Sequence, residues 1–254
     1  MKSKKRILIK VGTNLLTDQN QELDLNNMRN IVFQISDILR ENKTYEFIMV
    51  SSGAITCGAK HINIAPCCVS DQQAAAAIGQ ILLFKQYYDF FKLKGYCIGQ
   101  LLLTKENFSN PIRKTNIHQT IQALLTNDMI PIINENDSVA TDEIQFGDND
   151  QLSALIATNM DVDELIILSN IEGLLDANHN VIPELFCIGN NELALVNNAM
   201  GSATSKGGMR SKLMAAKMAS DAGIPVTLAN GRQPNIIDRI LNNESVGTRI
   251  KPKK

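Results

Sequence analysis

The sequence predicts an α/β protein with a mainly parallel central sheet and helices on both faces of that sheet. Short runs of consecutive apolar residues alternate with longer segments whose apolar residues recur at helical spacing, which is typical of strands alternating with helices. Most short runs lack a polar residue at every second position, as expected for strands buried on both faces. The chain has 254 residues, of which 44% are hydrophobic, so it can bury a large core.

The expected elements begin with a strand at 7–11. The helix after it carries seven apolar side chains on one face, the first at Leu25 and the last at Leu39. A long helix over about 71–94 is expected to end at Gly95. Further strands are expected at 47–50, 96–103, 130–133, 165–168 and 225–228, and further helices near 117–125, 150–158, 209–222 and 236–241. Residues 139–146 are expected to form a small hairpin, and the absence of repeats and linkers predicts a single domain over 1–254.

The composition argues against several classes of protein. The net charge of -1 provides no long-range attraction to nucleic acids or anionic membranes, so neither is expected as a partner. Five cysteines without a CxxC spacing and three scattered histidines support neither a disulfide framework nor a zinc site. The sequence has no signal-peptide pattern and no apolar run long enough to span a bilayer, which predicts a cytoplasmic protein.

Two clusters of amides and carboxylates follow the expected strand at 130–133. The first polar cluster is Asn-Glu-Asn-Asp at 134–137, and the second polar cluster is Gly-Asp-Asn-Asp at 147–150. Because open α/β sheets bind ligands at the carboxyl ends of their strands, both clusters are expected to line a site. Their carboxamides and carboxylates suit an ammonium group, which indicates a small aminated substrate. The alternative is that these residues form ordinary surface turns.

Four apolar runs end in glycines that stand next to polar or cationic groups. These glycines and their polar neighbours lie in the segments 10–13, 51–54, 134–150 and 206–212. Such turns let backbone N–H groups approach anionic oxygens, so the four together indicate phosphate binding. The usual nucleotide motifs are absent, because the nearest approach to GxxxxGK[ST] has Ala59 in place of the lysine and no GxGxxG occurs. A nucleotide would therefore be held by a different α/β kinase design.

Two lysines are candidate phosphate ligands. Lys10 lies in the expected first strand just before the glycine turn, and the alternative is a lysine on an edge strand. Lys212 is expected about one turn into a helix opened by Gly207 and Gly208, so its ammonium can reach an anion at the helix start. The alternative for Lys212 is a solvated lysine on a helix surface.

Several motifs, in order along the chain, resemble those of the amino acid kinase family, in the branch that phosphorylates glutamate. The resemblance runs from about Ile7 to Thr248. The motifs are IKVGTN at 9–14, VSSGAI at 50–55, GQLLLT at 99–104, PIINENDSVAT at 131–141, FGDNDQLSALIA at 146–157, KGGMRSKLMAA at 206–216 and SVGTRI at 245–250. This resemblance implies the three-layer sandwich of the family.

The resemblance implies ATP-dependent phosphorylation of the γ-carboxylate of L-glutamate, the first step of proline biosynthesis. Lys10 and Lys212 would stabilise the charge on the transferring phosphoryl group, and Asp150 would order the two lysines. The residues that would bind glutamate are Ser52, Gly53, Asn134, Asp137, Asp148 and Asn149. The residues that would bind ATP are Lys10, Gly12, Ser169, Asn170, Lys206, Gly207, Gly208, Met209, Arg210, Ser211 and Lys212. Mg²⁺ would be bound with the nucleotide, through phosphate and water rather than protein ligands.

The chain differs from the family pattern in three respects. Ser169-Asn170 stands where the family usually has Thr-Asp. Ser205-Lys206-Gly207-Gly208 stands where the family usually has Gly-Thr-Gly-Gly, which adds a cation near the phosphates. The C-terminal PUA domain of many members, which resembles RNA-modifying enzymes, is expected to be absent.

The resemblance also implies partners. A homo-oligomer, either a dimer or a tetramer, is expected, with inhibition by proline and hand-over of the labile product to glutamyl phosphate reductase. Two alternatives stay open: another kinase of the family, acting on acetylglutamate, aspartate, carbamate or a nucleoside monophosphate, or a non-catalytic sensor of nucleotides or amino acids. The polar clusters favour a free amino group, and the joint presence of Lys10, Asp150 and Lys212 favours catalysis over sensing.

Overall fold

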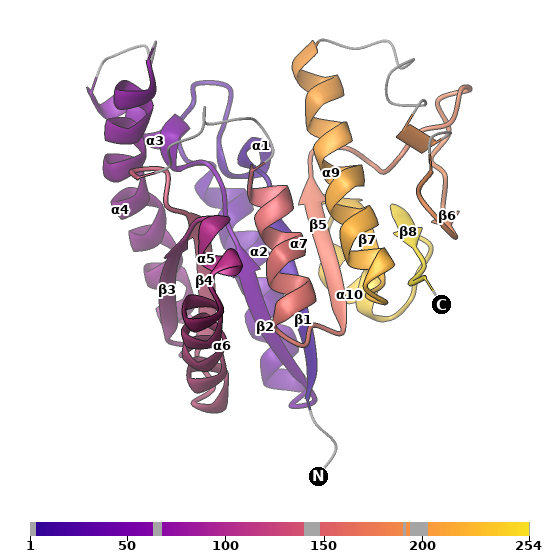
Figure 1. Ribbon diagram of the computed structural model, residues 1–254, viewed down its shortest axis with the longest axis horizontal. Coiled ribbons are helices and arrows are strands. Elements are labelled where there is room, and N and C mark those ends of the chain that lie inside the picture. Colours follow the sequence, from indigo (N-terminus) through magenta and orange to yellow (C-terminus); the bar gives the residue numbers. More distant parts are fainter. Residues whose placement is uncertain (1–3, 63–67, 140–147, 190–191, 194–202, 254) are drawn as a thin grey trace.

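An eight-stranded sheet lies at the centre of the protein, with the strand order β3-β4-β2-β1-β5-β7-β8-β6 (Figure 1). The computed structural model describes residues 4–62, 68–139, 148–189, 192–193 and 203–253. The first six strands in this order are parallel, whereas β8 pairs antiparallel with β7. The strands are β1 Lys5–Val11, β2 Tyr45–Val50, β3 Ile98–Leu103, β4 Ile130–Glu135, β5 Glu164–Ser169, β6 Glu184–Leu185, β7 Val226–Asn230 and β8 Thr248–Ile250.

Helices cover both faces of the sheet (Figure 1). They are α1 Thr13–Leu16, α2 Leu25–Glu41, α3 Ala54–Ile62, α4 Val69–Leu93, α5 Glu106–Ser109, α6 Pro111–Thr126, α7 Asp148–Asn159, α9 Ala203–Asp221 and α10 Ile236–Leu241. The side chains of α2, α4 and α10 pack on one face, called the α2 face, and those of α6, α7 and α9 pack on the other, called the α9 face. The prediction of a mainly parallel sheet between two helical layers is confirmed.

The alternating side chains of β1 separate the two halves of the core. Ile7, Ile9 and Val11 are fully buried on the α2 face, and Leu8 is fully buried on the α9 face. Successive side chains of a strand point to opposite faces, so Lys10 points to the α9 face. The strand lies between β2 and β5, and the interpretation of Lys10 as an edge-strand lysine is therefore wrong.

Side-chain caps set the starts of two long helices. Asp24 accepts a hydrogen bond from the backbone N–H of Asn27 at the start of α2. Asn110 accepts from two backbone N–H groups in the first turn of α6, whose first residue is Pro111. The fixed φ of proline suits this first helical position. The helix expected near 117–125 therefore begins at Pro111, earlier than its apolar residues indicated.

The start of α9 also differs from the prediction. The helix was expected near 209–222 but begins at Ala203, so Gly207 and Gly208 lie within the helix and not in a turn before it. Glycine lowers helix stability by about 1 kcal/mol relative to alanine, but it does not exclude a helical interior. Lys212 consequently lies about two and a half turns into α9 rather than about one turn.

Other differences concern short elements and strand ends. The elements α1, α3, α5, β6 and β8 were not predicted. All of these except the nine-residue α3 have four residues or fewer, and such short segments give little periodic signal. Strand β4 continues through Asn134 and Glu135, so these two residues are strand residues and not a surface turn. The hairpin expected at 139–146 lies, apart from Val139, outside the described residues.

Two glycines allow α3 and α4 to pack with their backbones in contact. A Cβ atom at Gly58 would lie 1.8 Å from the carbonyl oxygen of Ala75, and a Cβ atom at Gly79 would lie 1.8 Å from the carbonyl oxygen of Ala54. Real Cβ atoms do not approach backbone oxygen so closely, and backbone cannot move aside as a flexible side chain can. These glycines therefore set the distance between the two helices.

We expect Gly58→Ala to lower the free energy of unfolding by about 2 kcal/mol, because the added methyl group forces α3 and α4 apart. In a helix without this contact the same change would raise stability by about 1 kcal/mol. The sign of the change in urea midpoint therefore distinguishes the two cases. An increased midpoint would show that the helices are not held together by this glycine contact.

Candidate active site

Strands β1, β2, β4 and β5 end at one edge of the sheet, because they are parallel neighbours. Helix α7 leads into β5, and α9 leads into β7, so both helices begin at this edge (Figure 1). The carboxyl edge of the strands therefore meets the N-terminal ends of α7 and α9, where the helix dipoles favour anions.

A carboxylate between two ammonium groups forms the centre of this site. Asp150 Oδ1 lies 2.6 Å from Lys10 Nζ, and Asp150 Oδ2 lies 3.5 Å from Lys212 Nζ. The hydroxyl of Ser211 donates to the same Oδ2 at 2.6 Å. These residues come from β1, α7 and α9, so the tertiary fold brings together the three predicted catalytic residues. We call Lys10, Asp150 and Lys212 the charge cluster.

Burial and charge act against each other in the charge cluster. Asp150 is 1% exposed and Lys10 is 4% exposed. Burial opposes ionisation of Asp150, but the charges of Lys10 and Lys212 outweigh it and hold the pKa of this carboxyl below its ordinary value. Burial lowers the pKa of Lys212, although the attraction of Asp150 opposes that effect. With all three groups ionised the cluster carries a net positive charge, which suits an anionic ligand.

The turn after β2 carries Ser52 and Gly53. Gly53 has a φ of 95°, where a side chain would be strained, so this turn needs a glycine. The preceding residue, Ser51, is fully buried, and its hydroxyl lies 3.0 Å from the hydroxyl of Tyr87 on α4. Burial raises the pKa of Tyr87, so the phenol stays neutral and can hold the turn by a hydrogen bond. Sequence reasoning missed Tyr87, because its helical spacing marks it only as a core residue.

The first polar cluster lies partly on the α2 face, away from Lys10. Asn134 is fully buried, and its Nδ2 donates to Gln80 Oε1 on α4 at 2.6 Å. Its Oδ1 accepts from the backbone N–H of Glu135 at 2.9 Å, and Asn149 Oδ1 accepts from the same N–H at 3.2 Å. The predicted substrate residues Asn134 and Asn149 are therefore joined through one backbone group. Gln80 is a second residue that sequence reasoning missed.

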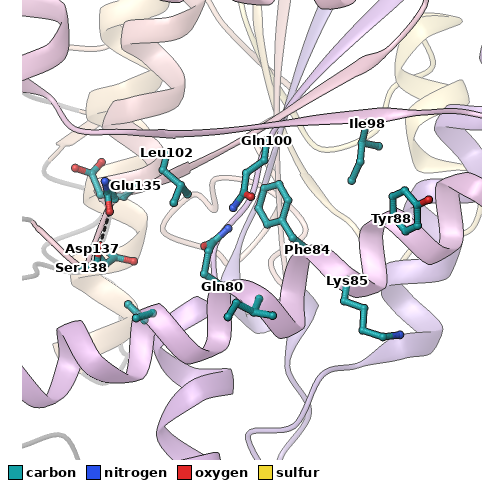
Figure 2. A pocket seen from close by; sticks show the side chains of 14 residues that line it. Gln80, Phe84, Lys85, Tyr88, Ile98, Gln100, Leu102, Glu135, Asp137 and Ser138 are labelled. Atoms are coloured by element: carbon teal, nitrogen blue, oxygen red, sulfur yellow. Dashed lines mark hydrogen bonds between the residues drawn. The ribbon is translucent and has the colours of Figure 1, made fainter.

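A groove of about 640 Å³ between α4 and β3 extends from this cluster (Figure 2). Asp137 lines the groove near its end, and Phe84 and Leu102 contribute apolar walls. Asp148 is the first residue of α7, directly before Asn149. The predicted glutamate residues thus lie after β2, at or after the end of β4, and in the first turn of α7, all at the same edge of the sheet.

Two predicted nucleotide residues lie beside the charge cluster, after β1 and at the end of β5. A Cβ atom at Gly12 would lie 3.7 Å from Lys10 Nζ and 3.9 Å from the Cβ of Ser169. Ser169 is buried as the last residue of β5, and Asn170 directly after it is exposed. An anion held by Lys10 would therefore meet little steric hindrance at Gly12.

The other predicted nucleotide residues lie on α9. The carbonyl of Gly208 accepts hydrogen bonds from Lys212 Nζ and from the Ser211 hydroxyl, each at 3.0 Å. Met209 packs against the core, and Arg210 is exposed. Lys206 and Gly207 belong to the first turns of the helix rather than to a glycine loop. The segment thus meets the charge cluster from a helix, although the sequence indicated a turn.

Two negative findings concern only the part of the chain that the structure describes. No three His, Cys, Asp or Glu side chains there form a group that could hold a metal ion. No helix there is long and apolar enough to cross a membrane.

The sequence and the fold have counterparts among known proteins. The sequence model of the amino acid kinase family matches residues 5–230, and the chain therefore belongs to the amino acid kinase family. The UMP kinase of Bacillus anthracis has a similar structure, with a TM-score of 0.64 and 18% identity over 100% of this chain and 98% of that one. The UMP kinase of Ureaplasma parvum gives a TM-score of 0.63 and 14% identity over 98% of this chain and 100% of that one. At these identities the likeness concerns the fold alone.

Curated relatives narrow the assignment within the family. A protein named glutamate 5-kinase from Symbiobacterium thermophilum is 40% identical over 96% of this chain and 95% of the relative. Another from Clostridium perfringens is 40% identical over 100% of this chain and 98% of the relative. One from Thermoanaerobacter sp. strain X514 is 40% identical over 98% of this chain, which spans 68% of that protein. Within the family, the chain groups with the glutamate 5-kinases.

We expect Asp150→Asn to lower the free energy of unfolding at pH 7 by about 3 kcal/mol, because Lys10 and Lys212 would then share a buried site without a counter-charge. The folded pKa of Asp150 is depressed, so its stabilisation is complete above the unfolded value of about 3.9 and is lost as the pH falls through the lower folded value. The difference in the free energy of unfolding between wild type and variant should therefore narrow only below about pH 4. Urea unfolding at a series of pH values measures this difference.

Asp89→Asn is the matched control for this experiment. Asp89 Oδ2 lies 2.6 Å from Lys85 Nζ, the same distance as in the buried pair, but the Asp89 side chain is 43% exposed. Exposed pairs of this kind contribute about 0.5 kcal/mol or less. Equal losses in the two variants would contradict a special contribution of the buried charge cluster.

Proposed function

We propose that the chain transfers the γ-phosphoryl group of ATP to the γ-carboxylate of L-glutamate, which gives ADP and L-glutamyl 5-phosphate for proline biosynthesis. The observation that carries this proposal is the charge cluster at the carboxyl edge of the sheet, with Lys10 Nζ 2.6 Å from Asp150 Oδ1 and Lys212 Nζ 3.5 Å from Oδ2. The relatives named glutamate 5-kinase support glutamate as the acceptor.

The chemistry requires positioning and charge neutralisation. One oxygen of the γ-carboxylate forms a bond to Pγ while the bond from Pγ to the β,γ-bridging oxygen breaks and ADP leaves with that electron pair. The acceptor carboxylate is already ionised at neutral pH, so no general base is needed. The obstacle to the reaction is repulsion between the acceptor carboxylate and the phosphates of ATP, which are both anionic. Lys10 and Lys212 would neutralise the charge on the transferring group, and Asp150 would hold both ammonium groups in place.

The glutamate would bind beside the charge cluster at the ends of β2 and β4 and the start of α7. The ammonium of glutamate suits the carboxylate of Asp137, and its acceptor carboxylate suits donors such as the Ser52 hydroxyl and the Asn149 carboxamide. The residues proposed for this site are Ser52, Gly53, Asn134, Asp137, Asp148 and Asn149.

ATP would bind on the side of the cluster formed by β1, β5 and α9. The residues proposed for it are Lys10, Gly12, Ser169, Asn170, Lys206, Gly207, Gly208, Met209, Arg210, Ser211 and Lys212. Mg²⁺ bound with the nucleotide would add charge neutralisation to that of Lys10 and Lys212. The ion would be held mainly by phosphate and water rather than by protein ligands.

The product suggests how the protein works with others. Acyl phosphates hydrolyse readily, so we propose hand-over of L-glutamyl 5-phosphate to glutamyl phosphate reductase. A homo-oligomer, dimer or tetramer, in the cytoplasm completes the proposal. A coupled assay in which an added trap captures all the intermediate would exclude direct hand-over, and sedimentation as a monomer would exclude the oligomer.

The choice of acceptor is tested by incubating the purified chain with ATP, Mg²⁺ and one candidate acid, with hydroxylamine to trap the acyl phosphate. We expect hydroxamate from L-glutamate, because the site offers acceptors for a free ammonium. Acetylglutamate and aspartate serve as matched acids, the first without that ammonium and the second one methylene shorter. Hydroxamate from either of these and none from glutamate would reassign the substrate, and no product from any acid would favour a sensor.

We expect Lys212→Ala to lower kcat by about 10²–10³-fold with little change in the KM for glutamate, because the lysine contact strengthens mainly in the transition state. Steady-state kinetics with each substrate varied in turn measure this split. The control is Lys217→Ala, five residues further along α9, whose ammonium pairs with Asp221 at the surface. A KM for glutamate that rises as much as kcat falls would exclude the proposed role.

A further inference from the structure

Two buried carboxamides lie next to each other at the carboxyl end of β4. Asn134 is fully buried and Gln80 is 8% exposed. They are joined by a 2.6 Å hydrogen bond from Asn134 Nδ2 to Gln80 Oε1. The contact forms because alternation along β4 turns Asn134 to the α2 face, where α4 passes beneath the strand. Gln80 itself is outside the residues proposed above for glutamate and ATP.

The orientation of each amide follows from one backbone group. The N–H of Glu135 can only donate, so the oxygen atoms of Asn134 and Asn149 must face it, at 2.9 Å and 3.2 Å. The Nδ2 of Asn134 is then left to face Gln80, whose Oε1 must accept. This carboxamide chain, Gln80 to Asn134 to Glu135 N–H to Asn149, runs from α4 on the α2 face to α7 on the α9 face.

A purely structural role does not explain the two amides. The Nε2 of Gln80 is buried and has no hydrogen-bond partner among the described residues, and Figure 2 shows Gln80 pointing across the groove toward Gln100. Burying an unsatisfied polar group destabilises a protein, whereas an apolar residue of the same volume would pack there without that penalty. Polar groups that break packing rules in this way concentrate at functional sites.

We propose that Gln80 is a positioning residue for glutamate binding, which rests on the function proposed above. By accepting from Asn134, Gln80 fixes the Asn134 oxygen against the Glu135 N–H. That N–H also orients Asn149, so the Asn149 Nδ2 is turned away from the strand and is free to donate to the substrate. Gln80 therefore acts on the glutamate half of the site from the opposite face of the sheet, without touching ATP or the charge cluster.

The test compares Gln80→Met, which keeps the side-chain length and removes the acceptor, with Gln80→Glu, which keeps an acceptor for Asn134. We expect Gln80→Met to raise the KM for glutamate about tenfold, the effect of one hydrogen bond, with the KM for ATP and kcat within about twofold of wild type. Gln80→Glu should raise the KM for glutamate much less than Gln80→Met does. Ile81→Ala is the control, because Ile81 lines the same groove but is 72% exposed and is outside the carboxamide chain.

A double variant separates positioning from general stability. If Gln80 acts through Asn149, the effect of Gln80→Met on the KM for glutamate should vanish in an Asn149→Ala background. Additive effects, an unchanged KM in Gln80→Met, or equal rises in the KM for glutamate and for ATP with a lowered Tm would each overturn the proposal. Wild-type protein that does not phosphorylate glutamate would overturn the proposed function as well, whereas an active wild type with an unaffected Gln80→Met overturns only the positioning role.

Discussion

The buried carboxylate of Asp150 is the constraint on which the site depends. Two lysine ammonium groups approach it from β1 and α9, and without it they would repel each other in a largely buried region. Removing charges from water is unfavourable, and the attraction to Asp150 offsets that penalty for both lysines. The arrangement leaves an excess of positive charge at the sheet edge. That excess suits the negative charge of a phosphoryl group, so under the proposed function the same interaction would serve both stability and catalysis.

Parallel topology supplies the geometry for this cluster. The strands β1, β2, β4 and β5 all end at one edge, and each of α7 and α9 begins there because it must run back before the next parallel strand. The alternation of side chains along β1 then decides to which face of the sheet each residue points. Leu8 and Lys10 point to the α9 face, so the one charged residue within the apolar run at 7–11 lies beside Asp150. A shift of one residue in the pairing of β1 would bury Lys10 among the side chains of α2 instead.

The sequence predicts the parts of this arrangement that depend on local chemistry. Apolar runs located the six parallel strands, and the polar residues at their ends indicated the edge at which the charge cluster lies. The start of α9 could not be predicted in this way, because the adjacent glycines Gly207 and Gly208 indicate a turn when only their neighbours in the sequence are considered. The partner of Asn134 was equally hidden, since the pairing with Gln80 requires the face on which α4 packs and the register of β4. Contacts between residues distant in sequence are fixed by topology, which residue type alone does not reveal.

The first turn of α7 joins the two halves of the site. Asn149 and Asp150 are consecutive residues, and successive side chains of a helix point about 100° apart. Asn149 therefore faces the Glu135 N–H at the end of β4, while Asp150 faces Lys10 and Lys212. A change that moves α7 should disturb both substrates together. A change at Gln80 on α4, by contrast, would reach Asn149 on α7 through the carboxamide chain, so its effect should be confined to the glutamate half. The separation of these effects follows from which face of the sheet each helix covers.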